Sequence, residues 1–226
     1  MKPQPAPRVV TVGVTGHRLN QLPETERPRI RDQVAACIES IERAALEVCK
    51  GRARFTLVSA IAEGADRYAA DLALGRGWRL VTPLPFNPAR YEEDFEEEDS
   101  KAHYQRLLWA SHRVAPVSAD AVAAIGGRAA EYAAVGRAVI EKADVLLCVW
   151  NGLPPKGPGG TSEVAALMLE RGGLVLWIAV GAGVAAPVRL VAPAPLPRAR
   201  SFKRNLHEAL AQHYERAARP PEMRVA

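Results

Sequence analysis

The chain has 226 residues, a length that suits one large α/β domain, or one domain with a small appendage. Of these residues 48% are hydrophobic and 24% are charged, and this balance excludes a largely disordered protein. The formal net charge of +5 favours an anionic partner, but the arginines are dispersed along the chain, so we expect a small anion rather than nucleic acid. Three cysteines without a CxxC spacing indicate free thiols, and no stretch reaches the length needed to span a bilayer, so we expect a cytoplasmic protein without membrane contact.

Short β-branched runs alternate along the chain with longer helical patterns. The expected strands are 9–14, 55–59, 79–84, a short run at 114–117, 145–150 and 174–180. The expected helices, from apolar residues at three- and four-residue spacing, are 24–49, 65–74, 101–110, 128–142 and one that opens near 161. This alternation predicts an α/β fold, a Rossmann-like, doubly wound and mainly parallel sheet flanked by helices.

The composition also predicts where the domain begins and ends. We expect residues 1–8 as an N-terminal tail, 9–181 as the Rossmann-like domain, and 182–226 as a Pro/Ala-rich wrapping segment followed by an amphipathic helix. The apolar stripe of that helix, from Phe202 to Tyr214, either packs on its own domain or forms a homodimer interface.

Small or ligand-capable residues follow the ends of three expected strands. In a doubly wound sheet, ligands bind outside the carboxyl ends of the strands, near the point where strand order reverses. The residues that follow the strands 9–14, 55–59 and 145–150 should therefore share one edge. From these we take as ligand-binding candidates Gly16, His17, Arg18, Glu63, Gly64, Ala65, Asp66, Arg67, Trp150, Gly152, Gly159, Gly160, Thr161 and Ser162.

The segment 159–163, Gly-Gly-Thr-Ser-Glu, is the main candidate for an anion cradle. Its glycines let the backbone approach a ligand closely, and Thr161 or Ser162 can cap a helix whose free N–H groups and positive dipole end attract phosphate. Glu163 lies in the first turn, where it either faces the same site or completes the cap of an ordinary loop.

The other candidate segments have two interpretations each. Gly16 allows a tight turn and Arg18 can pair an anionic group bidentately, or the turn is simply solvated. The run 63–67 either starts a helix, with acidic residues favoured by its dipole, or holds ribose hydroxyls. Trp150 is either a packing residue or a flank for a base.

Several standard motifs are missing from the sequence. GxGxxG after the first strand, the P-loop GxxxxGK[ST] and GxSxG are all absent, which argues against an ordinary NAD enzyme, a P-loop ATPase and a serine hydrolase. The histidines show no paired ligand spacing, and the acidic run from Glu92 to Asp99 is expected to be a solvated face. We therefore expect neither a metal ion nor a cofactor.

Taken together, these segments resemble the SLOG superfamily, a Rossmann-like group that includes the lonely-guy phosphoribohydrolases and the DNA-processing protein A family. The resemblance covers about residues 8–181. It rests on the stretches 13–18, 59–67, 83–86 followed by Tyr91 and Asp94-Phe95, and 150–152 together with 159–161.

The resemblance implies a nucleotide or nucleotide-derived ligand at the glycine loops. In the phosphoribohydrolases a PGGxGTxxE motif supplies phosphate contacts and a catalytic Glu, and an Arg on the preceding helix assists. Here 158–163 is a contracted form of that motif, and Glu163 and Arg137 are the matching candidates. The DNA-processing relatives bind single-stranded DNA, for which a basic cluster with interleaved aromatics would be favoured.

Three functional hypotheses follow from these observations. The leading one is a protein that binds a nucleotide or nucleotide-derived phosphate ligand at the C-terminal edge of the sheet, as a sensor. The alternative is a nucleoside 5'-monophosphate phosphoribohydrolase, an N-glycosidase in which Glu163 activates water while Arg18 and the helix N-terminus hold phosphate. Single-stranded nucleic-acid binding is the second alternative.

Overall fold

The computed structural model describes residues 6–117, 127–154, 159–181, 187–193 and 201–218. Within these ranges the chain forms a seven-stranded sheet in the order β4-β3-β2-β1-β5-β6-β7. The strands are β1 (Arg8–Gly16), β2 (Ala53–Val58), β3 (Arg79–Leu84), β4 (Arg113–Pro116), β5 (Val145–Trp150), β6 (Leu174–Ala179) and β7 (Arg189–Val191). All neighbouring pairs are parallel except β6 and β7, which are antiparallel.

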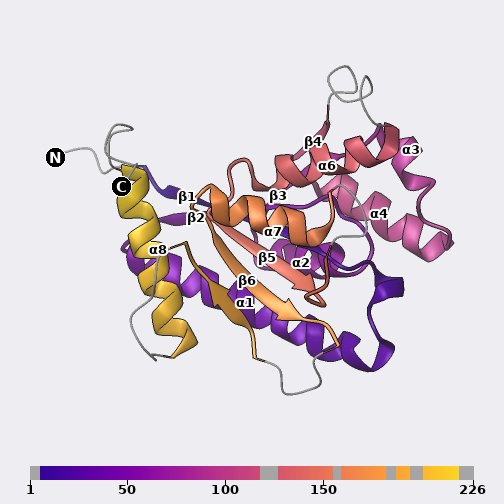
Figure 1. The fold of residues 1–226 in the computed structure, drawn as a ribbon. Helices are drawn as coiled ribbons and strands as arrows, with labels where there is room; N and C mark the ends of the chain where they lie inside the picture. The colour runs from indigo at the N-terminus through magenta and orange to yellow at the C-terminus, as the bar shows by residue number, and fades with distance from the viewer. Residues whose placement is uncertain (1–5, 118–126, 155–158, 182–186, 194–200, 219–226) are drawn as a thin grey trace.

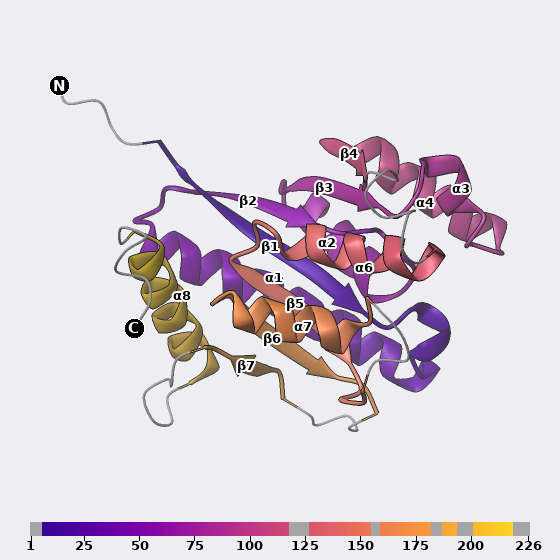
Figure 2. The same ribbon diagram turned by 45° about the horizontal axis from the view of Figure 1, so that its top comes forward.

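Helices cover both faces of the sheet (Figures 1 and 2). They are α1 (Arg27–Val48), α2 (Ala65–Gly75), α3 (Pro88–Glu92), α4 (Glu98–Ala110), α6 (Gly127–Ile140), α7 (Thr161–Glu170) and α8 (Phe202–Ala218). Figure 2 shows α6 and α7 on one side of the sheet and α1 on the other. The expected Rossmann-like α/β fold is thereby confirmed.

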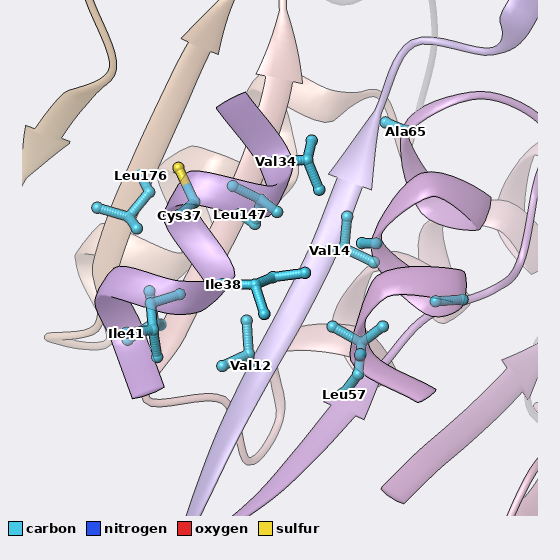
Figure 3. Close-up of a cluster of buried hydrophobic side chains, with 14 of the residues drawn as sticks. Val12, Val14, Val34, Cys37, Ile38, Ile41, Leu57, Ala65, Leu147 and Leu176 are labelled. Atoms are coloured by element: carbon cyan, nitrogen blue, oxygen red, sulfur yellow. The ribbon is translucent and has the colours of Figure 1, made fainter. Parts of the chain in front are cut away.

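The two faces of β1 explain this layering, because successive side chains of a strand point to opposite sides. Val10, Val12 and Val14 are fully buried in the core against α1 and α2. Figure 3 shows Val12 and Val14 beside Ile38 of α1. On the other face Gly13 leaves room for α6, since a Cβ there would lie 3.0 Å from the Val139 side chain.

The C-terminal helix packs on its own domain. Leu206, Ala209, Leu210 and Tyr214 of α8 are buried in the core that contains α1. The short strand β7 extends the sheet within a region expected to be a loop, so that expectation is wrong at residues 189–191. Three paired residues are too few to produce a recognisable alternation in a Pro/Ala-rich sequence. Most of the expected wrapping segment lies outside the described residues.

The first long helix begins later than its apolar pattern predicts. Two short 3-10 turns, η1 (Leu19–Gln21) and η2 (Glu24–Glu26), precede α1, which starts at Arg27. Pro28 lies in the first turn of α1, where backbone N–H groups have no acceptor within the helix, so the missing N–H of proline costs no hydrogen bond. None of the helices in the described ranges is both long enough and apolar enough to cross a membrane.

Candidate functional site

The order of the strands reverses between β1 and β5. From β1 the chain proceeds outward through β2, β3 and β4, and then returns to place β5 on the other side of β1. The carboxyl ends of these two strands lie together, since Gly16 pairs with Val149 and the His17 N–H donates to the Val149 carbonyl at 2.9 Å. A crevice beyond such a reversal is the usual ligand position in open α/β sheets.

A cleft of about 1000 Å³ opens at this edge. Its described lining comes from the segment after β1, the segment after β5, the start of α7, the start of α6 and the loop between α3 and α4. The lining residues are His17, Arg18, Asn20, Gln21, Asp94, Arg128, Ala129, Tyr132, Trp150, Asn151, Leu153, Pro154, Gly159, Gly160, Thr161 and Ser162. Seven of the predicted ligand-binding residues are therefore brought together: His17, Arg18, Trp150 and the four residues of the segment 159–162.

Gly16 closes the end of β1 against α2. A Cβ at this position would lie 2.6 Å from the Ala65 Cβ and 2.9 Å from the Val149 carbonyl oxygen. Gly64 lies equally close to the segment after β1. It has a φ of +88°, and a Cβ there would clash with the His17 carbonyl oxygen at 2.6 Å. Gly16, Gly64 and Ala65 thus support His17 and Arg18 by packing.

The remaining residues of the 63–67 segment are buried or bonded internally. Asp66 is 6% exposed and accepts a hydrogen bond from Ser59 Oγ at 3.2 Å. Burial raises the pKa of Asp66 to about 7, although hydrogen bonds from Ser59 and from the Ala62 backbone oppose this shift. Arg67 lies over the Phe95 ring and donates to the Ile61 carbonyl.

None of the residues from Glu63 to Arg67 is among the described residues that line the cleft. Glu63 accepts a short hydrogen bond from the Ser100 hydroxyl, which also accepts from Arg67 Nη1. The segment therefore connects α2 to α4 next to the cleft. Gly152 is also not among the described lining residues. Its φ of +83° turns the chain beside the Trp177 ring.

The glycine loop packs directly on α6. Gly159 has a φ of +77°, and a Cβ there would lie 2.7 Å from the Ala133 backbone nitrogen. The Gly159 N–H donates to Glu163 Oε2 at 2.8 Å, so the Glu163 carboxylate closes the loop. Helix α7 takes Gly160 as its N-cap, without a side-chain cap, so the expectation that Thr161 or Ser162 caps the helix is wrong.

The start of α7 offers donors to the cleft. The first N–H groups of any helix have no acceptor within the helix, and they carry the positive end of its dipole. Thr161 and Ser162 are the first two residues of α7, and both line the cleft. The Ser162 hydroxyl oxygen is buried and has no hydrogen-bond partner among the described residues.

The cleft lining also contains a group of side chains that the sequence did not reveal. Asp94 was expected on a solvated face, but its side chain is only 6% exposed and it accepts hydrogen bonds from Arg18 Nη2 at 3.4 Å and from the Tyr132 hydroxyl. Arg128 Nη2 forms an ion pair with the other Asp94 carboxylate oxygen. The expectation of a solvated face is therefore wrong at Asp94, because two arginines and a tyrosine surround its carboxylate.

A signal for this group was nevertheless present. Asp94 belongs to one of the stretches that carry the family resemblance. Arg128 and Tyr132 are four residues apart on α6, a spacing that places two side chains on one helical face. What the sequence did not reveal is that the α3–α4 loop meets α6 at the cleft.

The two residues proposed for hydrolysis occupy different surroundings. Glu163 lies beside the cleft but is engaged by the Gly159 N–H. Arg137 is exposed on α6, nine residues after Arg128, and is not among the described lining residues. Trp150 lines the cleft while its indole nitrogen donates to the Leu153 carbonyl at 2.8 Å and its ring lies 5.3 Å from that of Trp177.

The chain has a distant similarity to a solved structure. No family model matches the chain, and no curated protein matches it either. Among solved structures it is similar to the X-ray structure of DNA processing protein A (DprA) from Streptococcus pneumoniae, at 12% sequence identity and a TM-score of 0.44. The match covers 95% of this chain and 58% of that one, so the chain spans little more than half the length of the solved protein. At this identity the similarity concerns the fold alone.

Proposed function

We propose that this protein binds a nucleotide or nucleotide-derived phosphate ligand in the cleft between β1 and β5, and that it acts as a receptor for that ligand. The observation that carries the proposal is the open start of α7 at a strand-order reversal. There Thr161 and Ser162, the first two residues of the helix, line the cleft, and Ser162 Oγ is left without a partner in the described part of the chain. A phosphate group would accept hydrogen bonds from the first N–H groups of α7, which have no acceptor within the helix.

The rest of the lining fits the same class of ligand. Arg18 and Arg128 add positive charge to the cleft lining, which favours an anion. Trp150 offers an aromatic surface beside the glycine loop, where a base can stack. His17, Asn20 and Asn151 add polar groups of the kind that fix the orientation of a ligand.

Hydrolysis receives less support than binding. A general base needs a carboxylate oxygen within reach of water, and Glu163 uses one oxygen to close the glycine loop. Arg137 is exposed away from the described lining. We therefore expect no free base to be released when the protein is incubated with AMP, GMP, CMP or UMP. If base were released by the original protein but not by the Glu163→Gln variant, the protein would be a hydrolase instead.

The decisive experiment uses a charge placed at the start of α7. Isothermal titration calorimetry with the four nucleoside monophosphates should show saturable binding of at least one. Thr161→Asp should weaken that binding roughly tenfold or more, because a carboxylate there takes the helix N–H groups and repels phosphate, while the same charge is tolerated by the helix dipole.

Ala166→Asp is the matched control, since Ala166 is exposed on the same helix and the substitution adds the same charge five residues further along. Its affinity should stay within about threefold of the original protein, as an exposed charge beyond the first turn acts weakly. Mass spectrometry of small molecules that co-purify would name the natural ligand. Equal binding by the original protein and Thr161→Asp would refute the proposal, as would preferential binding of oligonucleotides.

A further inference from the structure

The cleft lining contains a cationic group formed by Arg18, Asp94 and Arg128, which we call the paired-arginine group. Arg18 comes from the segment after β1, Asp94 from the α3–α4 loop and Arg128 from the first turn of α6. Both arginines contact the carboxylate of Asp94, which is 6% exposed on its side chain. A buried carboxylate with partners from two other elements fixes the position of both guanidinium groups.

The group retains the capacity to bind a further anion. Each guanidinium has five N–H donors, and both arginines contact Asp94 through Nη2. Their side chains are 34% and 51% exposed, so the remaining donors have access to the cleft that both residues line. Two guanidinium charges against one carboxylate also leave the group positive.

Tyr132 sets the separation between this group and the glycine loop. Gly159 packs on the backbone of α6 at Tyr132 and Ala133, where a Cβ would approach within 2.8 Å. The hydroxyl at the far end of the Tyr132 side chain donates to Asp94 and accepts from Arg18 Nη2 at 3.4 Å. Gly159, two residues before α7, and the paired-arginine group are thus about one tyrosine side chain apart, and both line the same cleft.

From this arrangement we infer that the cleft takes a ligand with two phosphate groups, one at the start of α7 and the other at the paired-arginine group. This inference rests on the proposed function and deepens it. Arg18 and Arg128 contact the second phosphate, whereas Asp94 is a positioning residue that holds the two guanidinium groups toward it. The two phosphates are either adjacent, as in a nucleoside diphosphate, or separated by a ribose, as in a 3',5'-bisphosphate.

The test compares ligands that differ by one phosphate. Calorimetric titrations of the full chain with AMP, ADP and adenosine 3',5'-bisphosphate are accompanied by inorganic phosphate and pyrophosphate, which carry no base. At least one ligand with two phosphates should bind about tenfold or more tightly than its counterpart with one, a typical gain for a charge-assisted contact. Tighter binding of ADP would identify adjacent phosphates, and tighter binding of the bisphosphate would identify phosphates separated by ribose.

Arg128→Gln then tests where the second phosphate binds. This variant should lose most of the preference for two phosphates, measured as the ratio of the dissociation constants of AMP and ADP, because Arg128 contacts the second phosphate whereas the first is held at α7. Arg31→Gln is the control, since Arg31 is exposed on α1 and its loss removes the same charge. Circular dichroism and a thermal melt establish that each variant is folded.

Asp94→Asn separates positioning from simple charge. Asparagine makes the cleft more positive, so a purely electrostatic role for Asp94 predicts tighter binding of ADP. We expect the opposite, a loss of the preference for two phosphates, because the guanidinium groups lose the carboxylate that orients them. The inference is overturned if two phosphates bind no more tightly than one, or if Arg128→Gln weakens AMP and ADP equally. Absence of binding by every ligand would instead overturn the proposed function.

Discussion

Asp66 lies beneath the segment that carries Arg18, in a position where its carboxyl is surrounded by hydrogen-bond donors. The Ser59 hydroxyl donates to it, and so do the backbone N–H groups of Ala62 and Ala60. These bonds favour the ionised form, but burial disfavours it more strongly and raises the pKa from 3.8 to about 7. The carboxyl therefore gains a proton on folding throughout the weakly acidic range.

This shift determines a pH dependence of stability. Between about pH 4 and pH 7 the folded chain holds a proton on Asp66 that the unfolded chain has released. The contribution to the free energy of unfolding is fully present below about pH 4 and is lost as the pH rises through 7. Urea denaturation of the original protein and of Asp66→Asn at a series of pH values measures it, since other groups titrate alike in both.

We expect the difference in the free energy of unfolding, original protein minus Asp66→Asn, to decrease from pH 4 to pH 7. Parallel pH profiles for the two proteins would show that Asp66 has an ordinary pKa. A difference that increases with pH would show that hydrogen bonding to the carboxylate outweighs burial.

At the scale of elements, the contact between β1 and α2 positions the segment after β1, which lines the cleft. Gly16 allows Ala65, the first residue of α2, to approach the end of the strand. Gly16→Ala should lower the free energy of unfolding by about 1–3 kcal/mol, since the added methyl overlaps a buried side chain and a carbonyl. The displacement of the segment after β1 should also weaken nucleotide binding, measured by calorimetry.

Gly75→Ala provides the matched control for this substitution. Gly75 lies at the end of α2, and a Cβ there meets nothing within 4 Å. Alanine in a helix is favoured over glycine by roughly 0.5–1 kcal/mol, so this variant should be as stable as the original protein or more so. If both variants were destabilised alike, the effect would not come from the Gly16–Ala65 contact.

The elements differ in how far the sequence could predict them. β5 and β6 are buried over nearly their whole length, so each forms an uninterrupted apolar run in the sequence, and the run of valines in β1 over 9–14 is interrupted only by Thr11 and Gly13. His17 and Arg18 were found because they directly follow β1, and the segment 159–162 was found because its glycines lie in the loop between β5 and the next expected helix. Asp94 and Arg128 were missed because neither residue comes directly after a strand in the sequence. Their meeting depends on how α3, α4 and α6 pack, which local patterns do not encode.

At the scale of the whole molecule, α8 belongs to the core of the domain. Leu206 and Leu210 are fully buried, and the apolar stripe considered for a homodimer is covered by the protein's own helices. Leu210→Ala should therefore lower the free energy of unfolding by about 2–5 kcal/mol, the usual effect of emptying a buried leucine site. Its sedimentation coefficient at a temperature well below the melt should equal that of the original protein.

A homodimer held by this stripe would behave differently. Leu210→Ala would then shift the sedimentation profile toward a lighter species and make the melting temperature depend more steeply on protein concentration. Either result would show that the stripe has a second role besides packing on α1. Dimerisation itself stays a prediction, to be sought on other surfaces.

The strand-order reversal has a mechanical consequence for a bound ligand. Arg18 and Asp94 belong to the half of the chain that builds β1 to β4, whereas the start of α7 belongs to the half that builds β5 and β6. A molecule held by residues of both halves ties them together across the seam of the sheet. Its binding free energy then opposes the separation of the two halves. With ligand bound, the amide hydrogens of both β1 and β5 should therefore exchange more slowly than without it.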